Sequence, residues 1–338
     1  MQQVIKSVNC LSGLPSLLRQ KNAADILLVA GNHLQGNAEL KKIVSEISGQ
    51  VTIIHPPEGL LQIDSIPLIQ TTDAVVAIGG GKVIDYAKGI IHKSGKSIDS
   101  TFIAVPTTAG SGSEATPFAV LYSGKNKLSL ESPLLLPDIV MLDASLVSNL
   151  PKKQKAISGA DAFSQCIEAL WNVHHTEVSD QFAVEGLRSL SEGLPVFIHS
   201  SDNQLAEDML WAAHLAGTAI ATTKTTGPHA LSYYLTAHHD VPHGQAVALF
   251  LPLFFLYNEK KIPSQSYEAF QASTASEAFI ICTKFLKKLE LATNFNELNI
   301  ENVDIDALLK SVNHERFSNN PVPFDENVLR SLINHYLV

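Results

Sequence analysis

The sequence predicts an α/β domain over residues 1–150, followed by an all-helical domain over residues 151–338. In the first part, short apolar runs bounded by turn residues alternate with helical patterns. After Pro151 the apolar residues recur at helical spacing, without runs of strand type. A length of 338 residues also suits two domains of ordinary size.

The first domain contains apolar runs of strand length. They lie at residues 26–30, 51–54, 74–78, 101–105 and 139–142. Each run is followed closely by glycine, proline or aspartate, which commonly end strands. Short apolar strands that are separated by helices predict a parallel sheet covered on both faces.

The second domain shows helical spacing in longer segments. They lie at residues 161–171, 179–194, 205–222 and 276–289. We expect the active site in the cleft between the two domains, because clefts of this kind are the usual place for ligands.

Composition excludes several classes of protein. The chain carries 24 basic and 33 acidic residues, a formal charge of -9, whereas nucleic-acid binders usually show a basic stripe. Three cysteines (Cys10, Cys166 and Cys282) form no CxxC pair, which favours a reducing compartment. The N-terminus lacks a signal-peptide core, and the apolar stretch 246–257 is too short to span a bilayer. We expect a cytoplasmic protein without a membrane or nucleic-acid partner.

Residues 74–85 read as a strand, a glycine turn and a helix. Gly79, Gly80 and Gly81 allow a tight turn and a close approach to a ligand. The helix that starts near Val83 would direct free N–H groups at a pyrophosphate. The pattern is not GxGxxG, so a plain strand-to-helix turn, with Asp85 complementing the helix dipole, is the alternative. The loop 106–114 also follows a strand and offers hydroxyls and glycines, as a cofactor loop or an ordinary loop would.

A buried acid and two distant histidines form the candidate metal site. Asp161 lies in an apolar helix, where a carboxylate is costly unless it is paired or bound to a metal. His229 follows Pro228, which suits a first helical turn, and His243 follows Pro242 and opens the next helix. One carboxylate and two imidazoles can hold a divalent cation and leave a position for substrate. The alternative is chance, since the chain has 13 histidines.

Two further side chains share the helix of Asp161. Gln165 lies four residues later and therefore on the same face. Glu168, seven residues after Asp161, is roughly on that face too and is expected to support a metal ligand from behind.

At these residues the chain resembles the iron-containing (group III) alcohol dehydrogenase family, which includes glycerol dehydrogenases and shares its architecture with dehydroquinate synthase. The matching stretches are 79–88, 106–114, 161–169, 229 with 242–244, and 319–321. The resemblance implies an NAD(P)-binding α/β domain and a helical domain that binds Fe²⁺ or Zn²⁺. It implies metal ligands at Asp161, His229 and His243, with Gln165 as the fourth candidate. It implies cofactor contacts at Gly80, Gly81, Lys82, Asp85, Thr107, Thr108, Thr116 and, near the nicotinamide, Lys127.

The chain departs from the iron branch at two positions. Gln165 stands where that branch has a histidine, although glycerol dehydrogenases also lack it and use zinc. Tyr233 stands where many members place a second histidine near the substrate. A metal-free member resembling maleylacetate reductases is therefore an alternative.

One subgroup is especially similar. Residues 224–233, together with Ser164 and Gln165, look like those of phosphonoacetaldehyde reductases, which form 2-hydroxyethylphosphonate. Lys224, Thr225 and Thr226 would supply a cation and hydroxyl donors to the phosphonate. The alternative for Lys224 is an ordinary surface lysine. Lys224 and Tyr233, the latter as part of a proton relay, are the catalytic candidates.

The predicted function is therefore metal-dependent, NAD(P)H-linked reduction of a small aldehyde to an alcohol, with the anionic phosphonoacetaldehyde as the expected substrate. No acid follows the strand 51–54 closely, so either NAD or NADP is permitted. The resemblance implies a homodimer or larger assembly. Alternatives are another alcohol or glycerol dehydrogenase, a dehydroquinate synthase-like lyase that uses NAD transiently, and an inactive nucleotide-binding protein.

Overall fold

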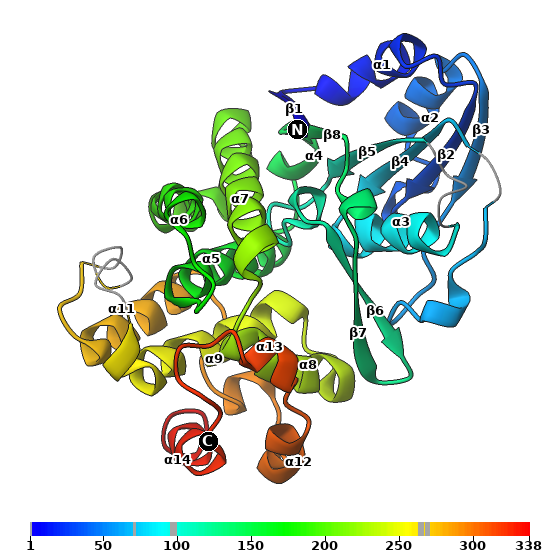
Figure 1. Cartoon of the computed structure of the whole chain (residues 1–338). Coiled ribbons are helices and arrows are strands. Elements are labelled where there is room, and N and C mark those ends of the chain that lie inside the picture. The colour runs from blue at the N-terminus through cyan, green and yellow to red at the C-terminus, as the bar shows by residue number, and fades with distance from the viewer. Residues whose placement is uncertain (1, 70–71, 95–99, 263–266, 268–270) are drawn as a thin grey trace. The chain divides into compact units, whose positions relative to one another are not determined.

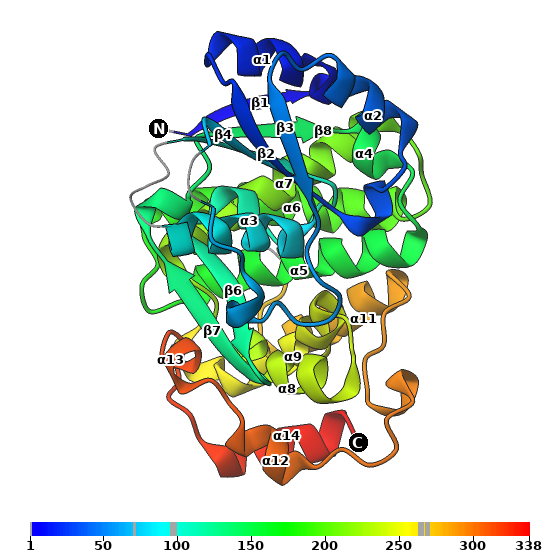
Figure 2. The same cartoon turned by 90° about the vertical axis from the view of Figure 1, so that its right-hand side faces the viewer.

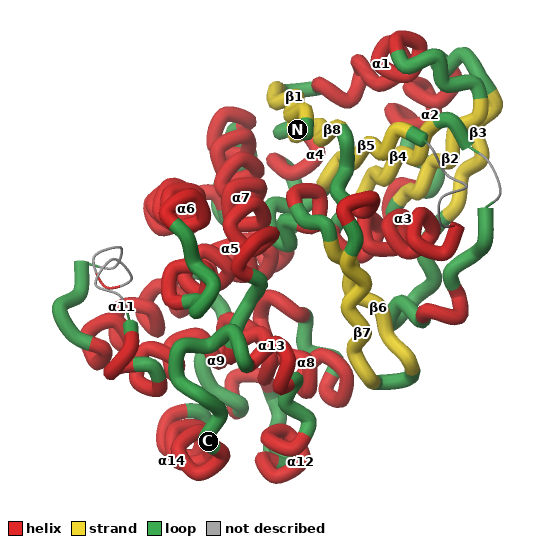
Figure 3. Tube along the Cα trace, in the orientation of Figure 1, coloured by secondary structure: helices red, strands yellow, loops and turns green. Residues whose placement is uncertain are grey.

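The elements of the computed structural model divide between two units, and the structure describes residues 2–69, 72–94, 100–262, 267 and 271–338. Unit 1 consists of Met1–Leu150 and Ser201–Trp211, and unit 2 of Pro151–Ser200 and Ala212–Val338. Within the described residues every strand belongs to unit 1, and unit 2 is helical (Figures 1 and 3). The predicted succession of an α/β part and a helical part is confirmed.

A parallel sheet forms the centre of unit 1, with the strand order β1-β8-β5-β4-β2-β3. Its strands are β1 (Gln3–Ser7), β2 (Asp25–Ala30), β3 (Gln50–Ile54), β4 (Ala74–Gly79), β5 (Thr101–Pro106) and β8 (Ile139–Asp143). The predicted runs correspond to β2, β3, β4, β5 and β8. Strand β4 is buried at every position, because helices cover both faces of the sheet.

Alternate residues of the strands serve two separate cores. Ile26 and Leu28 of β2 pack with helices α1 (Leu14–Gln20) and α2 (Ala38–Ser45). Leu27 and Val29 point to the opposite face and pack with helix α3 (Gly81–Ser94). The sheet is therefore a layer between α1 and α2 on one side and α3 on the other (Figure 1).

The order of the strands reverses between β2 and β4. Strand β3 lies on one side of β2, whereas β4, β5 and β8 lie on the other side. Parallel sheets bind ligands at the carboxyl ends of the strands next to such a reversal. The glycine turn leaves β4 at this point, and Thr107, just after β5, donates its backbone N–H to Gly79 O (3.1 Å).

A two-stranded antiparallel hairpin, absent from the sequence prediction, completes unit 1. It consists of β6 (Phe118–Ser123) and β7 (Asn126–Glu131), packs against α3 and turns at Gly124, whose φ is 61° (Figure 2). The short helix α4 (Ser145–Ser148) follows β8. Edge strand β1 was also not predicted, because it is only partly buried and carries polar residues.

Unit 2 is built from helices, and helix α7 runs from unit 1 into it. The helices are α5 (Lys152–Trp171), α6 (Glu177–Phe197), α7 (Asn203–Thr223), α8 (Gly227–His239), α9 (His243–Tyr257), α11 (Ala275–Lys288), α12 (Ile305–Lys310), α13 (His314–Phe317) and α14 (Glu326–Tyr336). Helix α5 is buried from Lys155 to Trp171 and packs against α6 and α9.

The two histidine-bearing helices begin as the sequence predicts. Pro228 occupies the first turn of α8, and His243 is the first residue of α9, directly after Pro242. Among the described residues no helix is both long enough and apolar enough to cross a membrane.

Candidate metal centre and cofactor loops

Asp161, His229 and His243 come together in unit 2. Each offers one ligand atom, and these atoms lie within 4.8 Å of one another. Asp161 comes from the middle of α5, His229 from the first turn of α8 and His243 from the start of α9. Asp161 and His229 are buried, whereas His243 is partly exposed, so the cluster remains open on the side of His243.

The spacing of the Asp161 and His229 ligand atoms fits a divalent cation. Oδ1 of Asp161 lies 3.3 Å from Nε2 of His229 and is buried without a well-aligned hydrogen bond. Two ligands of a tetrahedral metal, at bonds of about 2.1 Å, lie about 3.4 Å apart. Burial alone raises the pKa of Asp161, but contact with His229 and the charge of His243 outweigh it, and its pKa falls below the usual value. The carboxylate is therefore ionised, as a ligand must be.

Glu168 holds the far side of the His229 ring. Its Oε2 accepts a hydrogen bond from His229 Nδ1, and its Oε1 accepts from Thr226 N (2.8 Å) and Thr226 Oγ1 (2.9 Å). Burial lowers the pKa of His229, but the charges and hydrogen bonds of Glu168 and Asp161 raise it overall to about 9. The support expected from Glu168 is thus directed at His229.

Gln165 lies one turn after Asp161, is buried, and hydrogen-bonds to the Asp161 carboxyl, which lowers the pKa of that group. Its side chain is therefore next to the candidate ligands. Whether its carboxamide oxygen binds a metal stays a prediction.

Gly244 allows α9 to approach α5 closely. A Cβ atom at this position would lie 2.2 Å from the backbone oxygen of Ile157 and 3.1 Å from Cβ of Asp161. No side chain fits there, so the glycine after His243 lets the first turn of α9 lie directly against the Asp161 region of α5.

Tyr233 stands beside the cluster. It follows His229 by one helical turn, and its ring is parallel to that of His243, with centroids 5.8 Å apart and an interplanar angle of 1°. The phenol is therefore close to the partly exposed side of the site. Its part in a proton relay stays a prediction.

Lys224 lies in the connection between α7 and α8, with a left-handed backbone (φ 65°). Two buried asparagines hold this connection: Asn172 Nδ2 donates to Lys224 O (3.3 Å), and Asn319 Nδ2 donates to Thr225 O (3.0 Å). The hydroxyl of Thr226 donates to Glu168, so its hydrogen is already engaged within the protein. The expected contacts of Lys224, Thr225 and Thr226 with a phosphonate stay predictions. Asn319 belongs to the motif 319–321, but its contact with Thr225 spans 94 residues and could not be foreseen.

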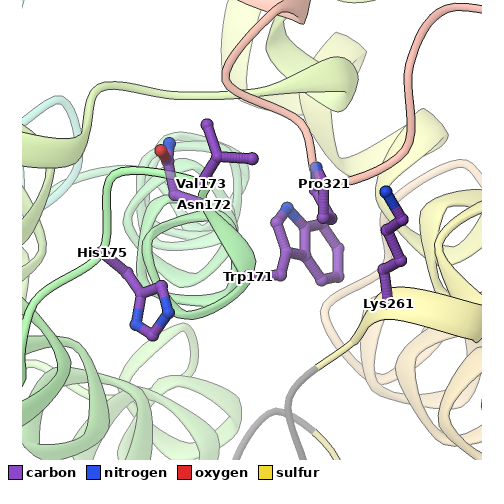
Figure 4. Close-up of a pocket in the computed structure, with 6 residues that line it drawn as sticks. All are labelled: Trp171, Asn172, Val173, His175, Lys261 and Pro321. Carbon is purple, nitrogen blue, oxygen red and sulfur yellow. The ribbon is translucent and has the colours of Figure 1, made fainter.

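A cavity of about 440 Å³ lies elsewhere in unit 2 (Figure 4). Its lining consists of Trp171, Asn172, Val173, His175, Lys261 and Pro321. None of the candidate ligands lines it, so this cavity is not the candidate metal centre. It borders the back of the α7–α8 connection, because Asn172 binds Lys224 O and Trp171 Nε1 donates to Thr226 Oγ1 (2.9 Å).

The glycine turn and the loop 107–112 touch each other in unit 1. A Cβ on Gly81 would lie 2.5 Å from Ser111 Oγ, and one on Gly80 would lie 3.3 Å from Thr108 Oγ1. Thr107 is buried and bonded to Gly79. Two candidate cofactor segments are therefore brought to one place at the carboxyl ends of β4 and β5.

Helix α3 fixes the loop that follows. The buried Lys88 ammonium donates to Ser113 O (2.6 Å), Thr116 O (2.8 Å) and Phe118 O (2.8 Å). One turn earlier, Asp85 accepts from Ser113 Oγ and from the backbone N of Val120 (2.9 Å). Burial lowers the pKa of Lys88 to about 8, against the opposing charges of Asp85 and Glu114.

The remaining cofactor candidates lie around this arrangement. Thr116 Oγ1 accepts a hydrogen bond from Lys88 (3.1 Å), and Asp85 accepts one from Val120 N. Both residues therefore make hydrogen bonds that hold the loop in place. Lys82 is exposed in the first turn of α3. Lys127 faces Tyr122 across the β6–β7 hairpin. Burial raises the pKa of Asp85, and the charges of Lys88 and Lys127 only partly oppose this rise. Contacts of these residues with a nucleotide stay predictions.

Comparison with known families explains this combination of fold and cluster. The C-terminal model of the Fe-containing alcohol dehydrogenase family matches residues 155–337, and the model of iron-containing alcohol dehydrogenase matches residues 2–144. The chain belongs to the iron-containing alcohol dehydrogenase family. It is accordingly an NAD(P)-dependent oxidoreductase of the alcohol dehydrogenase class.

Individual relatives extend this comparison. Maleylacetate reductase of Rhizobium sp. (strain MTP-10005) is 27% identical, over 95% of this chain and 91% of that protein. Phosphonoacetaldehyde reductase of Streptomyces viridochromogenes is 34% identical, but over 55% of this chain and only 53% of its own length. The structure of sulfoacetaldehyde reductase from Bifidobacterium kashiwanohense in complex with NAD+ superposes with a TM-score of 0.88. It covers 99% of this chain and 96% of that one at 23% identity, a likeness of fold.

Proposed function

We propose that this protein reduces a small aldehyde to the corresponding alcohol, using NADH or NADPH and a divalent metal held by Asp161, His229 and His243. The observation that carries the proposal is the convergence of one carboxylate and two imidazoles within 4.8 Å of one another. Three protein ligands of this kind leave a coordination position open for substrate, as catalytic metal sites require.

A bound Fe²⁺ or Zn²⁺ would supply Lewis-acid polarisation of the carbonyl, and the nicotinamide would supply the hydride. The side chains of this protein would position the metal and the substrate and would supply the electric field around them. Asp161 brings the negative charge, Glu168 holds the His229 ring, and Gln165 supports Asp161 or adds its carboxamide oxygen as a ligand. Tyr233, parallel to His243, is the candidate that holds the proton needed by the alcohol product.

The proposed cofactor site uses the glycine turn and the neighbouring loop. Gly80 and Gly81 would let the backbone approach a phosphate closely, with the hydroxyls of Thr107 and Thr108 beside it. His55 follows β3 and bonds Ala30 O through Nδ1 (2.8 Å), and no acid follows closely that would repel a 2′-phosphate. We therefore propose that NADPH is accepted as well as NADH, and rates with the two cofactors test this.

We further propose an anionic aldehyde as substrate, with phosphonoacetaldehyde first. Two relatives support this choice, since their names give maleylacetate and phosphonoacetaldehyde, which carry carboxylate and phosphonate groups. Lys224 supplies a cation in the segment that leads to His229, and Thr225 lies next to it.

The experiment is an NAD(P)H-oxidation screen of metal-stripped and metal-reloaded protein against phosphonoacetaldehyde, maleylacetate and neutral aldehydes. We expect turnover only after reloading with Fe²⁺ or Zn²⁺, and the highest kcat/KM with phosphonoacetaldehyde. Full activity of the metal-stripped protein would contradict the proposed need for a metal. A higher kcat/KM with neutral aldehydes than with phosphonoacetaldehyde would contradict the proposed anionic substrate. Absence of net NAD(P)H oxidation with every compound would instead favour a lyase or an inactive protein.

The variant Lys224→Met separates the substrate from the chemistry. Loss of one charge-assisted contact costs about 1.5–3 kcal/mol, or roughly 10–100-fold in kcat/KM. We expect this loss for phosphonoacetaldehyde and no comparable loss for a neutral aldehyde. An equal effect on both would show that Lys224 does not recognise the anion.

A further inference from the structure

The Glu168 side chain connects the two helices that carry Asp161 and His229. It lies in α5 and is fully buried, an environment in which a carboxylate needs several partners. Its Oε1 accepts two hydrogen bonds from Thr226, at the start of α8, and its Oε2 accepts one from His229 Nδ1. An ionised carboxylate suits this place because it only accepts hydrogen bonds.

Trp171 fixes the direction of these hydrogen bonds. The indole Nε1 can only donate, and it lies 2.9 Å from Thr226 Oγ1. Thr226 therefore accepts from Trp171 and gives its single hydroxyl hydrogen to Glu168 Oε1. The backbone N–H of Thr226 donates to the same oxygen, so Oε2 is left to accept the proton of His229.

We propose that Glu168 is a positioning residue that selects the tautomer of His229. When a cation displaces the Nε2 proton, Glu168 keeps the other ring proton on Nδ1, so that the lone pair of Nε2 faces the space shared with Asp161 and His243. This inference rests on the metal site of the proposed function. Nε2 is the atom 3.3 Å from Asp161 Oδ1, and a proton on Nε2 would occupy the place of the cation. Partners of this kind orient histidine ligands and increase their basicity.

The variant Glu168→Gln reverses the hydrogen-bond direction at His229 while keeping the shape of the side chain. Both Thr226 donors retain the single amide oxygen, because the amide NH₂ would clash with them. The NH₂ group then faces Nδ1, which must accept, and the ring proton moves to Nε2. We expect the affinity for Co²⁺, measured by chelator competition, to fall about 10–100-fold. The d–d absorption of the remaining bound Co²⁺ should change, since it reports the ligand set.

Thr226→Val is the matched control. It removes one hydrogen bond to Glu168 and the partner of Trp171, yet leaves the carboxylate on His229. We expect lower thermal stability but Co²⁺ affinity and absorption close to wild type. If Thr226→Val loses as much affinity as Glu168→Gln, general loosening explains both, and tautomer selection is overturned.

Failure of the metal site and failure of this inference are distinguishable. If wild-type protein binds no Co²⁺, or Asp161→Ala binds it as well as wild type, the proposed metal site is wrong. If wild type binds Co²⁺ through Asp161 and Glu168→Gln binds it equally tightly, only the role of Glu168 is wrong. If Glu168→Gln does not fold, ¹⁵N NMR spectra of wild-type protein with labelled histidines and bound Zn²⁺ show which nitrogen of His229 binds the metal. Metal on His229 Nε2 supports the inference, and metal on Nδ1 overturns it.

Discussion

His243 and Tyr233 lie ring to ring on the more exposed side of the candidate metal centre. Their proposed roles differ, because an imidazole can ligate a divalent cation whereas a neutral phenol mainly exchanges protons. The proposed function therefore assigns metal binding to His243 and proton transfer to the neighbouring Tyr233. Substitution of each ring tests this division without changing the helices that carry them.

We expect His243→Ala to lower metal affinity by about 100-fold or more, because loss of a supporting partner alone already costs 10–100-fold. Tyr233→Phe keeps the stacked ring and removes the hydroxyl, so we expect wild-type metal content with reduced kcat. Metal analysis after dialysis and steady-state rates are the measurements. A His243→Ala protein that keeps its metal, or a Tyr233→Phe protein that loses it, would contradict the assignment.

Single residues also show where sequence reasoning ends. The residue types at Asp161, His229 and His243 indicate a metal because a buried acid needs a partner, and the structure brings these three side chains together. The partner of Thr226 could not be predicted. Its hydroxyl binds Glu168 across 58 residues, and no local spacing encodes that contact.

Among the elements, the approach of α9 to α5 depends on Gly244. A methyl group there would press on the backbone oxygen of Ile157, which cannot move like a side chain. We expect Gly244→Ala to destabilise the protein by about 1–3 kcal/mol and to weaken metal binding, as the ligands of the two helices separate. Urea unfolding and chelator competition measure this. Gly13→Ala is the control, because no atom lies within 4 Å of its added Cβ, and wild-type metal affinity in Gly244→Ala would contradict the argument.

Helix α3 is expected to control the proposed cofactor loop through Lys88. Replacement by Met leaves the carbonyls of Ser113, Thr116 and Phe118 without their shared donor. We expect nucleotide affinity to fall about tenfold or more, equivalent to about 1.4 kcal/mol, with metal affinity unchanged. Calorimetric titration with NADH and NADPH measures this. Lys93→Met, on the same helix but bonded to Ile66 O, should bind nucleotide normally. A parallel loss in that variant would point to the helix as a whole.

Some strands can likewise be predicted from the sequence, whereas others cannot. Strands β2, β4, β5 and β8 are mostly buried and read as unbroken apolar runs, so the sequence predicts them. Strands β1 and β7 mix partly buried and exposed positions in no regular order. Strands β6 and β7 form a separate two-stranded sheet. Their place depends on pairing with distant or neighbouring strands rather than on their own apolar content.

For the whole molecule, the order of an α/β part and a helical part followed from apolar spacing alone. The assignment of Ser201–Trp211 to unit 1 did not, because this segment is helical like its surroundings in the sequence. Lys6 of β1 forms an ion pair with Glu207 (3.7 Å) and lies 5.0 Å from the centre of the Trp211 ring. Contacts between segments about 200 residues apart, and not local pattern, place the start of α7 in unit 1.

The two units should respond differently to alkaline pH. In unit 2, burial raises the pKa of the Cys166 and Cys282 thiols above the ordinary 9.0, so the folded state keeps protons that the unfolded chain loses. Each thiol then removes about 1.4 kcal/mol of stability per pH unit above pH 9. In unit 1, burial lowers the pKa of Lys88 from 10.5 to about 8, so stability rises from pH 8 to 9. Above pH 9 this gain is offset, because burial also raises the pKa of the Cys10 thiol in unit 1 from 9.0 to about 11.

Tryptophan fluorescence during urea unfolding measures this, because Trp171 lies in unit 2 and Trp211 in unit 1. Variants that keep one tryptophan each report one unit. We expect the Trp211 midpoint to rise from pH 8 to 9 and the Trp171 midpoint to fall above pH 9. Cys166→Ala with Cys282→Ala should abolish the fall, and Lys88→Met the rise. Coincident midpoints that both fall would mean that the units unfold as one, with the two thiols outweighing the single lysine.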